Sequence, residues 1–155
     1  MASAIDVGMK TEDSLPQVAC QVAREVLETM FFATAEPVSC RHPEPRADWI
    51  AAAVRFEGAP CGELRVMLSR ELAVAVACGF LGIDPDEVTG DEQDQVAREL
   101  ANMICGAMLS RLHPDSHVAL DAPETIPAVF DAAGGTHQCM ETPEGMLAIT
   151  MVARR

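Results

Sequence analysis

Apolar residues recur at helical spacing along three stretches of the chain, and each stretch predicts a helix. The first predicted helix follows Ser14, a favoured N-cap residue, carries Pro16 in its first turn and runs to about Thr34. The second covers residues 70–81, which are mostly apolar and rich in alanine, so it should be largely buried. The third covers residues 91–112 and is the longest of the three.

Shorter apolar runs, bounded by glycine and proline turns, predict strands. Two of them flank residues 58–60 (GAP) and should form a β-hairpin, whereas residues 36–48, with three prolines, are expected to be a loop. The predicted strands lie at residues 49–57, 61–69, 117–121, 126–130, 136–141 and 146–153. Because helices and strands are segregated along the chain, the predicted fold class is α+β with a mainly antiparallel sheet.

The first and third predicted helices share a hexapeptide pattern. Residues 21–26 read QVAREV and residues 95–100 read QVAREL, an offset of 74 residues. The same offset carries the turn after Glu57 onto the turn after Asp131. These matches predict an internal repeat of two helix-plus-hairpin units, and the alternative is a chance match between two amphipathic helices.

The predicted repeat aligns residues 16–69 with residues 90–143, and the two units should then superpose. They are not chemically equivalent. Glu28 in the first unit stands where the second has Asn102, and Phe32 stands where the second has Gly106.

The chain is acidic, which narrows the classes of partner. Of its 155 residues, 49% are hydrophobic and 23% are charged, with a formal net charge of −13. This composition suits a single domain over residues 14–155, preceded by a flexible tail at residues 1–13. Neither nucleic acid, which needs a basic face, nor an anionic membrane surface is an expected partner. With no signal-peptide pattern and no bilayer-length apolar run, the chain is expected to be cytoplasmic.

Cysteine and histidine residues do not follow the spacing of a metal site. The six cysteines lie too far apart for a CxxC pair, so we expect buried thiols, with no disulfide and no bound zinc. His113 and His117 have i, i+4 spacing, but Pro114 between them breaks the helix that would align them. The acidic run at residues 84–94 lacks the EF-hand ligand order and is better interpreted as carboxylates at a helix N-terminus.

The third predicted helix carries a polar stripe. At about 100° per residue, Gln95, Glu99, Asn102 and Gly106 lie roughly 115° from the centre of the apolar stripe. Asn102 is the only asparagine in the chain and has no capping role there, although asparagine is a poor helix former. Its carboxamide can position a water molecule, and Glu99 can pair with a lysine. From the pair alone, a solvated helix face is the better interpretation. The apolar stripe of this helix is predicted to consist of Val96, Leu100, Met103, Ile104 and Ala107.

Residues 91–108, DEQDQVARELANMICGAM, resemble the signature helix of the CheC/CheX/FliY family of chemotaxis phosphatases. That family carries Glu-x-x-Asn followed four positions later by a small residue, and the matching residues here are Glu99, Asn102 and Gly106. Residues 26–32, VLETMFF, are similar to the opening helix of CheX-like domains. The resemblance therefore identifies a CheX-like member of this family.

The resemblance implies a CheC/CheX-like α+β fold, with long helices packed on a mainly antiparallel sheet and an internal pseudo-twofold repeat. CheC-like members carry the Glu/Asn pair in both copies, whereas CheX-like members keep one. Glu28, in place of a first-copy asparagine, agrees with the single-site kind.

The resemblance also implies an activity, which is hydrolysis of the aspartyl phosphate of a CheY-like response-regulator receiver domain. Asn102 would orient the attacking water and Glu99 would pair with the receiver's lysine, with Gln95 and Gly106 in support. The receiver would bring the Mg²⁺, so the chain would need no cofactor of its own. The resemblance also allows a homodimer.

Two positions depart from the family pattern. Gln95 stands where aspartate or serine is common, and Thr125, between Pro123 and Pro127, stands where a proline is common. One alternative to the phosphatase is a non-catalytic CheX-like module that docks a receiver domain or another signalling partner. Another is an unrelated α+β interaction domain.

Overall fold

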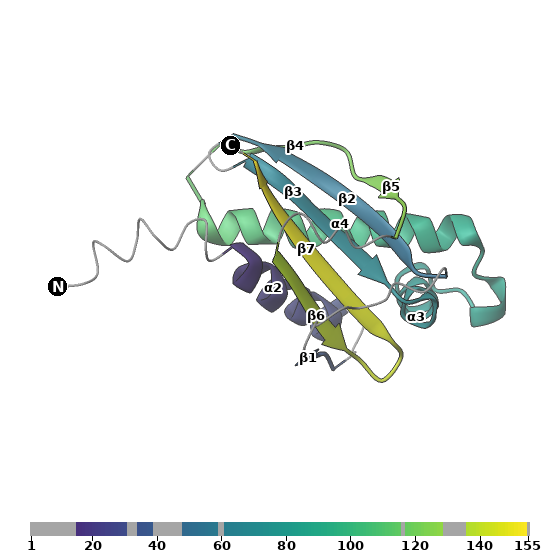
Figure 1. The fold of residues 1–155 in the computed structure, drawn as a ribbon. Helices are drawn as coiled ribbons and strands as arrows, with labels where there is room; N and C mark the ends of the chain where they lie inside the picture. Colours follow the sequence, from purple (N-terminus) through teal and green to yellow (C-terminus); the bar gives the residue numbers. More distant parts are fainter. Residues whose placement is uncertain are drawn as a thin grey trace.

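One antiparallel sheet with helices packed against one face makes up the fold (Figure 1). The computed structural model describes residues 15–30, 34–38, 48–58, 61–115, 117–128 and 136–154. The sheet has seven strands in the order β1-β6-β7-β3-β2-β4, with β5 also paired to β2. In chain order the elements are α2 (Leu15–Met30), β1 (Glu36–Val38), β2 (Ile50–Glu57), β3 (Cys61–Leu68), α3 (Arg70–Leu81), the 3-10 helix η1 (Pro85–Glu87), α4 (Gly90–Leu112), β4 (Ala119–Leu120), β5 (Glu124–Ile126), β6 (Thr136–Glu141) and β7 (Met146–Arg154).

Alternate residues of the central strands face the helices. Ala52, Val54 and Phe56 of β2 belong to the main core, together with apolar side chains of α2, α3 and α4. This period of two is expected for strands with one face covered by helices. Gly62 of β3 lies opposite Phe56, and a Cβ there would come within 2.9 Å of the Phe56 ring. The hairpin therefore needs a glycine at this position.

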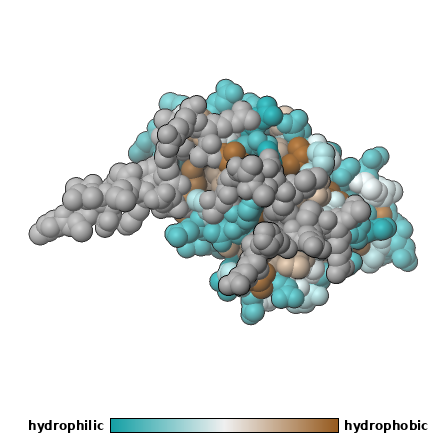
Figure 2. Space-filling model, viewed as in Figure 1, coloured by the Kyte–Doolittle hydropathy of each residue, from teal (hydrophilic) through white to brown (hydrophobic). Residues whose placement is uncertain are grey.

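The sheet face away from the helices carries a smaller apolar cluster. Hydrophilic residues make up much of the coloured surface seen from this side in Figure 2, in keeping with the acidic composition. In the described part of the chain, no helix is both long and apolar enough to cross a membrane. The buried members of the smaller cluster are Ala51, Met67, Cys139 and Ala148.

Both halves of the chain have the same order of elements. Each half begins with a long helix, α2 or α4, and continues with short strands, β1 in the first half and β4 and β5 in the second. A hairpin follows, formed by β2 and β3 in the first half and by β6 and β7 in the second. Since β3 and β7 are neighbours, the sheet order reads symmetrically outward from them. Helix α2 packs on β6 and β7, whereas α4 packs on β2 and β3. The predicted pseudo-twofold repeat is therefore confirmed.

The residue alignment predicted for the repeat is wrong in the hairpins. A constant offset of 74 residues would make β5 and β6 a hairpin, whereas β5 pairs with β2 and β6 pairs with β7. The counterpart of the turn after Glu57 is consequently the turn at residues 142–145. The turn predicted after Asp131 falls outside the described residues. The hexapeptide match applied only to the helices, because the two halves connect helix and hairpin with segments of different length.

Most predicted elements occur in the structure, but several bounds differ. The first helix ends at Met30 and not near Thr34, and the strand predicted at residues 117–121 covers only Ala119–Leu120. The second helix has the predicted bounds, with Ser69 Oγ accepting from the Leu72 N–H at its start and Gly82, at φ 68°, closing its end. Residues 36–38, predicted as loop, form β1, because an edge strand pairs with β6 and tolerates Pro37 there. The strand predicted at residues 126–130 lies instead at β5, where its register with β2 places it.

The expectation that the chain has no disulfide is wrong for Cys139, which is disulfide-bonded. Cys20, Cys78 and Cys105 are free thiols. Sequence spacing gave no sign of this bond, because only the fold brings distant cysteines within bonding distance. Burial raises the pKa of the Cys105 thiol to about 12.

Candidate functional site

Helix α4 carries the predicted site, and side-chain contacts hold both of its ends. Thr89 caps its start, where the Thr89 Oγ1 accepts from the Glu92 N–H at 3.3 Å and donates to Glu92 Oε1 at 3.0 Å. Asp91 and Glu92 lie in the first turn, where carboxylates favour the positive end of the helix dipole. Near the other end, Arg111 Nη1 donates to Glu25 Oε1 of α2 at 3.2 Å. The helix is thus anchored at its first turn and against α2.

The predicted site residues lie on the face of α4 that points away from the core. Gln95, Glu99 and Asn102 are exposed and Gly106 is half-buried. We call these four residues the Asn102 patch. The predicted exposure of Glu99 and Asn102 on one helix face is confirmed. The buried residues of α4 are Gln93, Val96, Ala97, Leu100, Ala101, Ile104, Cys105, Met108 and Leu109.

The Asn102 patch lies farther from the buried face than the sequence predicted. At about 100° per residue, the two faces are centred about 180° apart. Met103 and Ala107, which were predicted in the apolar stripe, are only half-buried, whereas Ala97, Ala101 and Cys105 are fully buried. The buried face is rotated because α4 packs against α2 and α3 as well as against the sheet.

The segment from β4 to β5 runs beside α4 and forms one wall of the patch. At one end, a Cβ on Gly106 would lie 3.8 Å from Leu120 Cδ1. At the other end, Arg98 Nη1 donates a hydrogen bond of 2.8 Å to Thr125 Oγ1. Arg98 and Gly106 stand four residues to either side of Asn102, so the segment follows the helix for about 12 Å past it.

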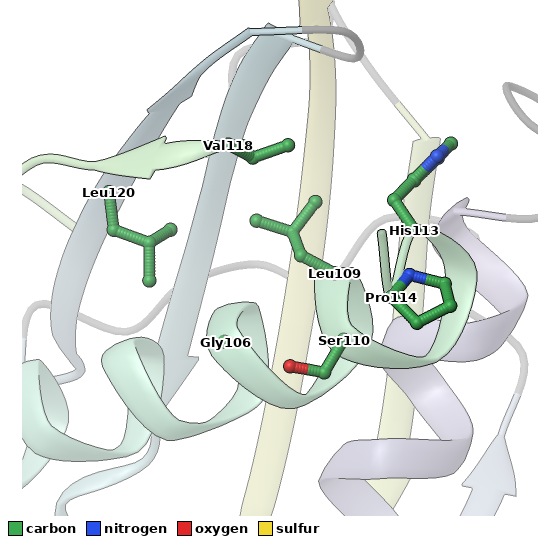
Figure 3. A pocket seen from close by; sticks show the side chains of 7 residues that line it. All are labelled: Gly106, Leu109, Ser110, His113, Pro114, Val118 and Leu120. Atoms are coloured by element: carbon green, nitrogen blue, oxygen red, sulfur yellow. The ribbon is translucent and has the colours of Figure 1, made fainter. Parts of the chain in front are cut away.

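A hollow of about 330 Å³ adjoins the patch at Gly106. It lies between the C-terminal turns of α4 and the chain that leads into β4 (Figure 3). Neither this hollow nor the Arg98–Thr125 contact can be predicted from the sequence, because both depend on how the chain after α4 returns along the helix. The hollow is lined by Gly106, Leu109, Ser110, His113, Pro114, Val118 and Leu120.

The polar side chains of the Asn102 patch are available to a partner molecule. Among the residues that the structure describes, none forms a hydrogen bond or ion pair with the Glu99 or Asn102 side chain. The carboxamide offers a donor and an acceptor, and the carboxylate offers acceptors. The thiol of Cys105, three residues after Asn102, is buried, and with a pKa of about 12 it is protonated at neutral pH. The patch can therefore orient a polar group or a water molecule and contains no activated nucleophile.

The corresponding position on α2 has different chemistry. In the helix alignment by the shared hexapeptide, Glu28 takes the place of Asn102, and its carboxylate pairs with Arg24 Nε at 3.4 Å. Phe32, the counterpart of Gly106, lies outside the described residues. Over the described ranges, no group of three or more His, Cys, Asp and Glu side chains could hold a metal ion.

The sequence of this chain matches the model of one protein family. The model of the family described as chemotaxis phosphatase CheX matches residues 50–148, which include α4 and most of the sheet. A search of the curated proteins finds no match.

Solved structures share the fold at low sequence identity. CheX from Vibrio vulnificus aligns with a TM-score of 0.74 and 17% identity, over 90% of this chain and 96% of that one. CheX from Desulfovibrio desulfuricans aligns with a TM-score of 0.69 and 16% identity, over 91% and 99% of the two chains. A chain of the CheX-CheY-BeF3-Mg²⁺ complex from Borrelia burgdorferi aligns with a TM-score of 0.64 and 17% identity, over 90% and 97%. At these identities the likeness establishes the fold.

Proposed function

Because this chain belongs to the CheX chemotaxis phosphatase family, we propose that it hydrolyses the aspartyl phosphate of a CheY-like receiver domain, with Asn102 and Glu99 as its working pair. The observation that carries the proposal is that both side chains are exposed on one face of α4, and no described residue forms a hydrogen bond or ion pair with either of them. A solvated helix face alone would not explain why the only asparagine of the chain stands there.

The proposed reaction is displacement at phosphorus by water. The water oxygen forms a new bond to phosphorus while the bond from phosphorus to the aspartyl oxygen breaks, which yields inorganic phosphate and the free carboxylate. The water's proton passes to the phosphate product or to solvent. Asn102 orients the water, accepting a hydrogen bond from it through the amide oxygen while the amide NH₂ donates to a phosphoryl oxygen. Positioning of this kind is a large part of catalysis in phosphoryl transfer.

Glu99 is proposed to pair with a lysine of the receiver. It lies three residues before Asn102, so both side chains project from one patch of the helix surface. An ion pair that becomes buried when the proteins dock fixes their relative orientation more than it adds affinity. Mg²⁺ bound by the receiver would neutralise charge on the phosphoryl group. The complex of a CheX from Borrelia burgdorferi with CheY, BeF3 and Mg²⁺ supports a receiver as the partner.

A release assay tests this proposal. Purified receiver domains are phosphorylated with a small-molecule phosphodonor, and the loss of phosphate is followed with and without this protein, with spontaneous hydrolysis subtracted. Faster release from one receiver, abolished by Asn102→Ala, is the expected result. If the wild-type protein binds a phosphorylated receiver and does not accelerate release, the docking-module alternative replaces the phosphatase.

A further inference from the structure

The hollow beside Gly106 lies within reach of any protein that docks on Asn102. By helix geometry Gly106 is about 6 Å and Ser110 about 12 Å along α4 from Asn102. A standard interface buries about 800 Å² on each partner, which corresponds to a patch of about 16 Å radius. A receiver centred on Asn102 therefore covers the hollow whichever way it is rotated about that residue.

The hollow differs chemically from the rest of the α4 surface. Leu109, Val118 and Leu120 present apolar side chains to it, and Figure 3 shows all three between α4 and the adjoining strand. Leu120 is 39% exposed, and among the described residues it is one of only two large apolar side chains in the exposed class. On the other side of Asn102, the exposed face carries Gln95 and Glu99. The surface around Asn102 thus has a polar end at Gln95 and Glu99 and an apolar end at the hollow.

We propose that this hollow is a docking subsite for an apolar side chain of the receiver domain, carried near its phosphorylated aspartate. The inference rests on the proposed function, because that function is what places a receiver domain over Asn102 and therefore over the hollow. Contact of Glu99 with a lysine at one end and an apolar side chain in the hollow at the other fixes the rotation of the receiver about Asn102. A few filled pockets usually carry most of the binding energy of an interface.

Two variants perturb the hollow in opposite ways. Leu120→Ser removes apolar surface from its wall, and Ser110→Trp fills it from an exposed position. Phe80→Ser is the matched control, because Phe80 is also 39% exposed and lies on α3, away from the C-terminal end of α4 (Figure 1). Thermal unfolding followed by circular dichroism verifies that each variant is folded.

The test uses the receiver that the wild-type protein dephosphorylates fastest. Its dissociation constant is measured in the beryllofluoride-activated form, and kcat and KM in the phosphorylated form. Leu120→Ser and Ser110→Trp should each raise Kd and KM about five- to tenfold, with kcat within about twofold of wild type. Phe80→Ser should leave all three unchanged.

Other outcomes overturn the inference. Unchanged binding by Leu120→Ser and Ser110→Trp, with turnover lost in Asn102→Ala, removes the subsite and leaves the proposed function intact. Equal weakening by Phe80→Ser shows a general surface effect and removes the subsite. If Leu120→Ser converts a dimer into a monomer in sedimentation velocity, a second copy is the occupant instead. If the wild-type protein neither binds nor dephosphorylates any receiver, the proposed function fails and the subsite with it.

Discussion

Arg98 of α4 donates a hydrogen bond of 2.8 Å to Thr125 Oγ1 of β5, and this contact holds the wall beside Asn102 against the helix. No other side-chain hydrogen bond between α4 and β5 occurs among the described residues. Arg98 stands four residues before Asn102 on α4. The Arg98–Thr125 hydrogen bond thus links α4 to the segment that borders the candidate site.

Thr125→Val should loosen that segment. Losing one partly exposed hydrogen bond should lower the free energy of unfolding by about 0.5–1 kcal/mol. Amides of residues 119–126 should then exchange faster in hydrogen-exchange measurements, while those of β3 and β7 stay protected. Thr125→Ser keeps the hydroxyl and is the control. Equal protection in wild type and Thr125→Val would mean that strand pairing with β2 alone holds the segment.

Asn102→Ala should abolish stimulated dephosphorylation and leave the protein folded. Asn102 is exposed and alanine is the better helix former, so the free energy of unfolding should stay the same or rise by up to about 0.7 kcal/mol. Turnover should fall far more than binding, because the amide acts mainly in the transition state. Phosphate release and circular dichroism measure the two effects. Wild-type activity in this variant would refute the assigned mechanism.

Glu99→Ala and Glu28→Ala form a matched pair of variants. Both residues are exposed glutamates on long helices. Glu99 stands three residues before Asn102 on α4, whereas Glu28 stands on α2 at the position aligned with Asn102. Glu99→Ala should raise KM and lower kcat, because it removes the pairing with the receiver's lysine. Glu28→Ala should be nearly silent, costing at most about 0.5 kcal/mol for its i, i+4 pair with Arg24. Equal loss of activity in both variants would show a second working site on α2.

Gly106→Ala should stabilise the protein. Glycine within a helix costs about 1 kcal/mol relative to alanine, and the added methyl would make an ordinary contact at 3.8 Å with Leu120 Cδ1. For a chain of this size the melting temperature should rise by about 3 °C. Since the methyl stands between Asn102 and the hollow, phosphatase activity should fall. Calorimetry and the release assay on the same sample separate the two effects, and unchanged activity would show that Gly106 does not keep space for the partner.

Glu25→Gln should change the acid sensitivity of the fold. The hydrogen bond from Arg111 lowers the pKa of Glu25 below the ordinary value of 4.5. A carboxylate whose pKa is lowered by folding stabilises the folded state above its unfolded pKa, and that contribution is lost as the pH falls through the folded pKa. The wild-type urea midpoint should therefore drop more steeply below about pH 4.5 than that of Glu25→Gln. The difference should be small, because both side chains are exposed, and should shrink in high salt. Parallel curves would mean that this ion pair does not link α2 to α4 in solution.

Periodicity and turn residues were sufficient to predict the helices and most strands. The apolar run at residues 70–81 became α3 with the predicted bounds, since Ser69 and Gly82 supply local caps. The class of the fold followed from the order of elements, and the exposure of Glu99 and Asn102 followed from helix geometry. These features depend on neighbours in the chain, which a sequence displays directly.

Pairing between distant segments was beyond what the sequence determined. Pro37 lies in a strand only because β6 offers it a partner, and the same kind of long-range pairing places β5 against β2. The disulfide of Cys139, the hollow at Gly106 and the Arg98–Thr125 bond also depend on contacts between residues far apart in the chain. The residues of the candidate site could thus be read from one helix, whereas the shape of the surface around them was decided by tertiary packing, because no local pattern encodes which distant segment packs alongside it.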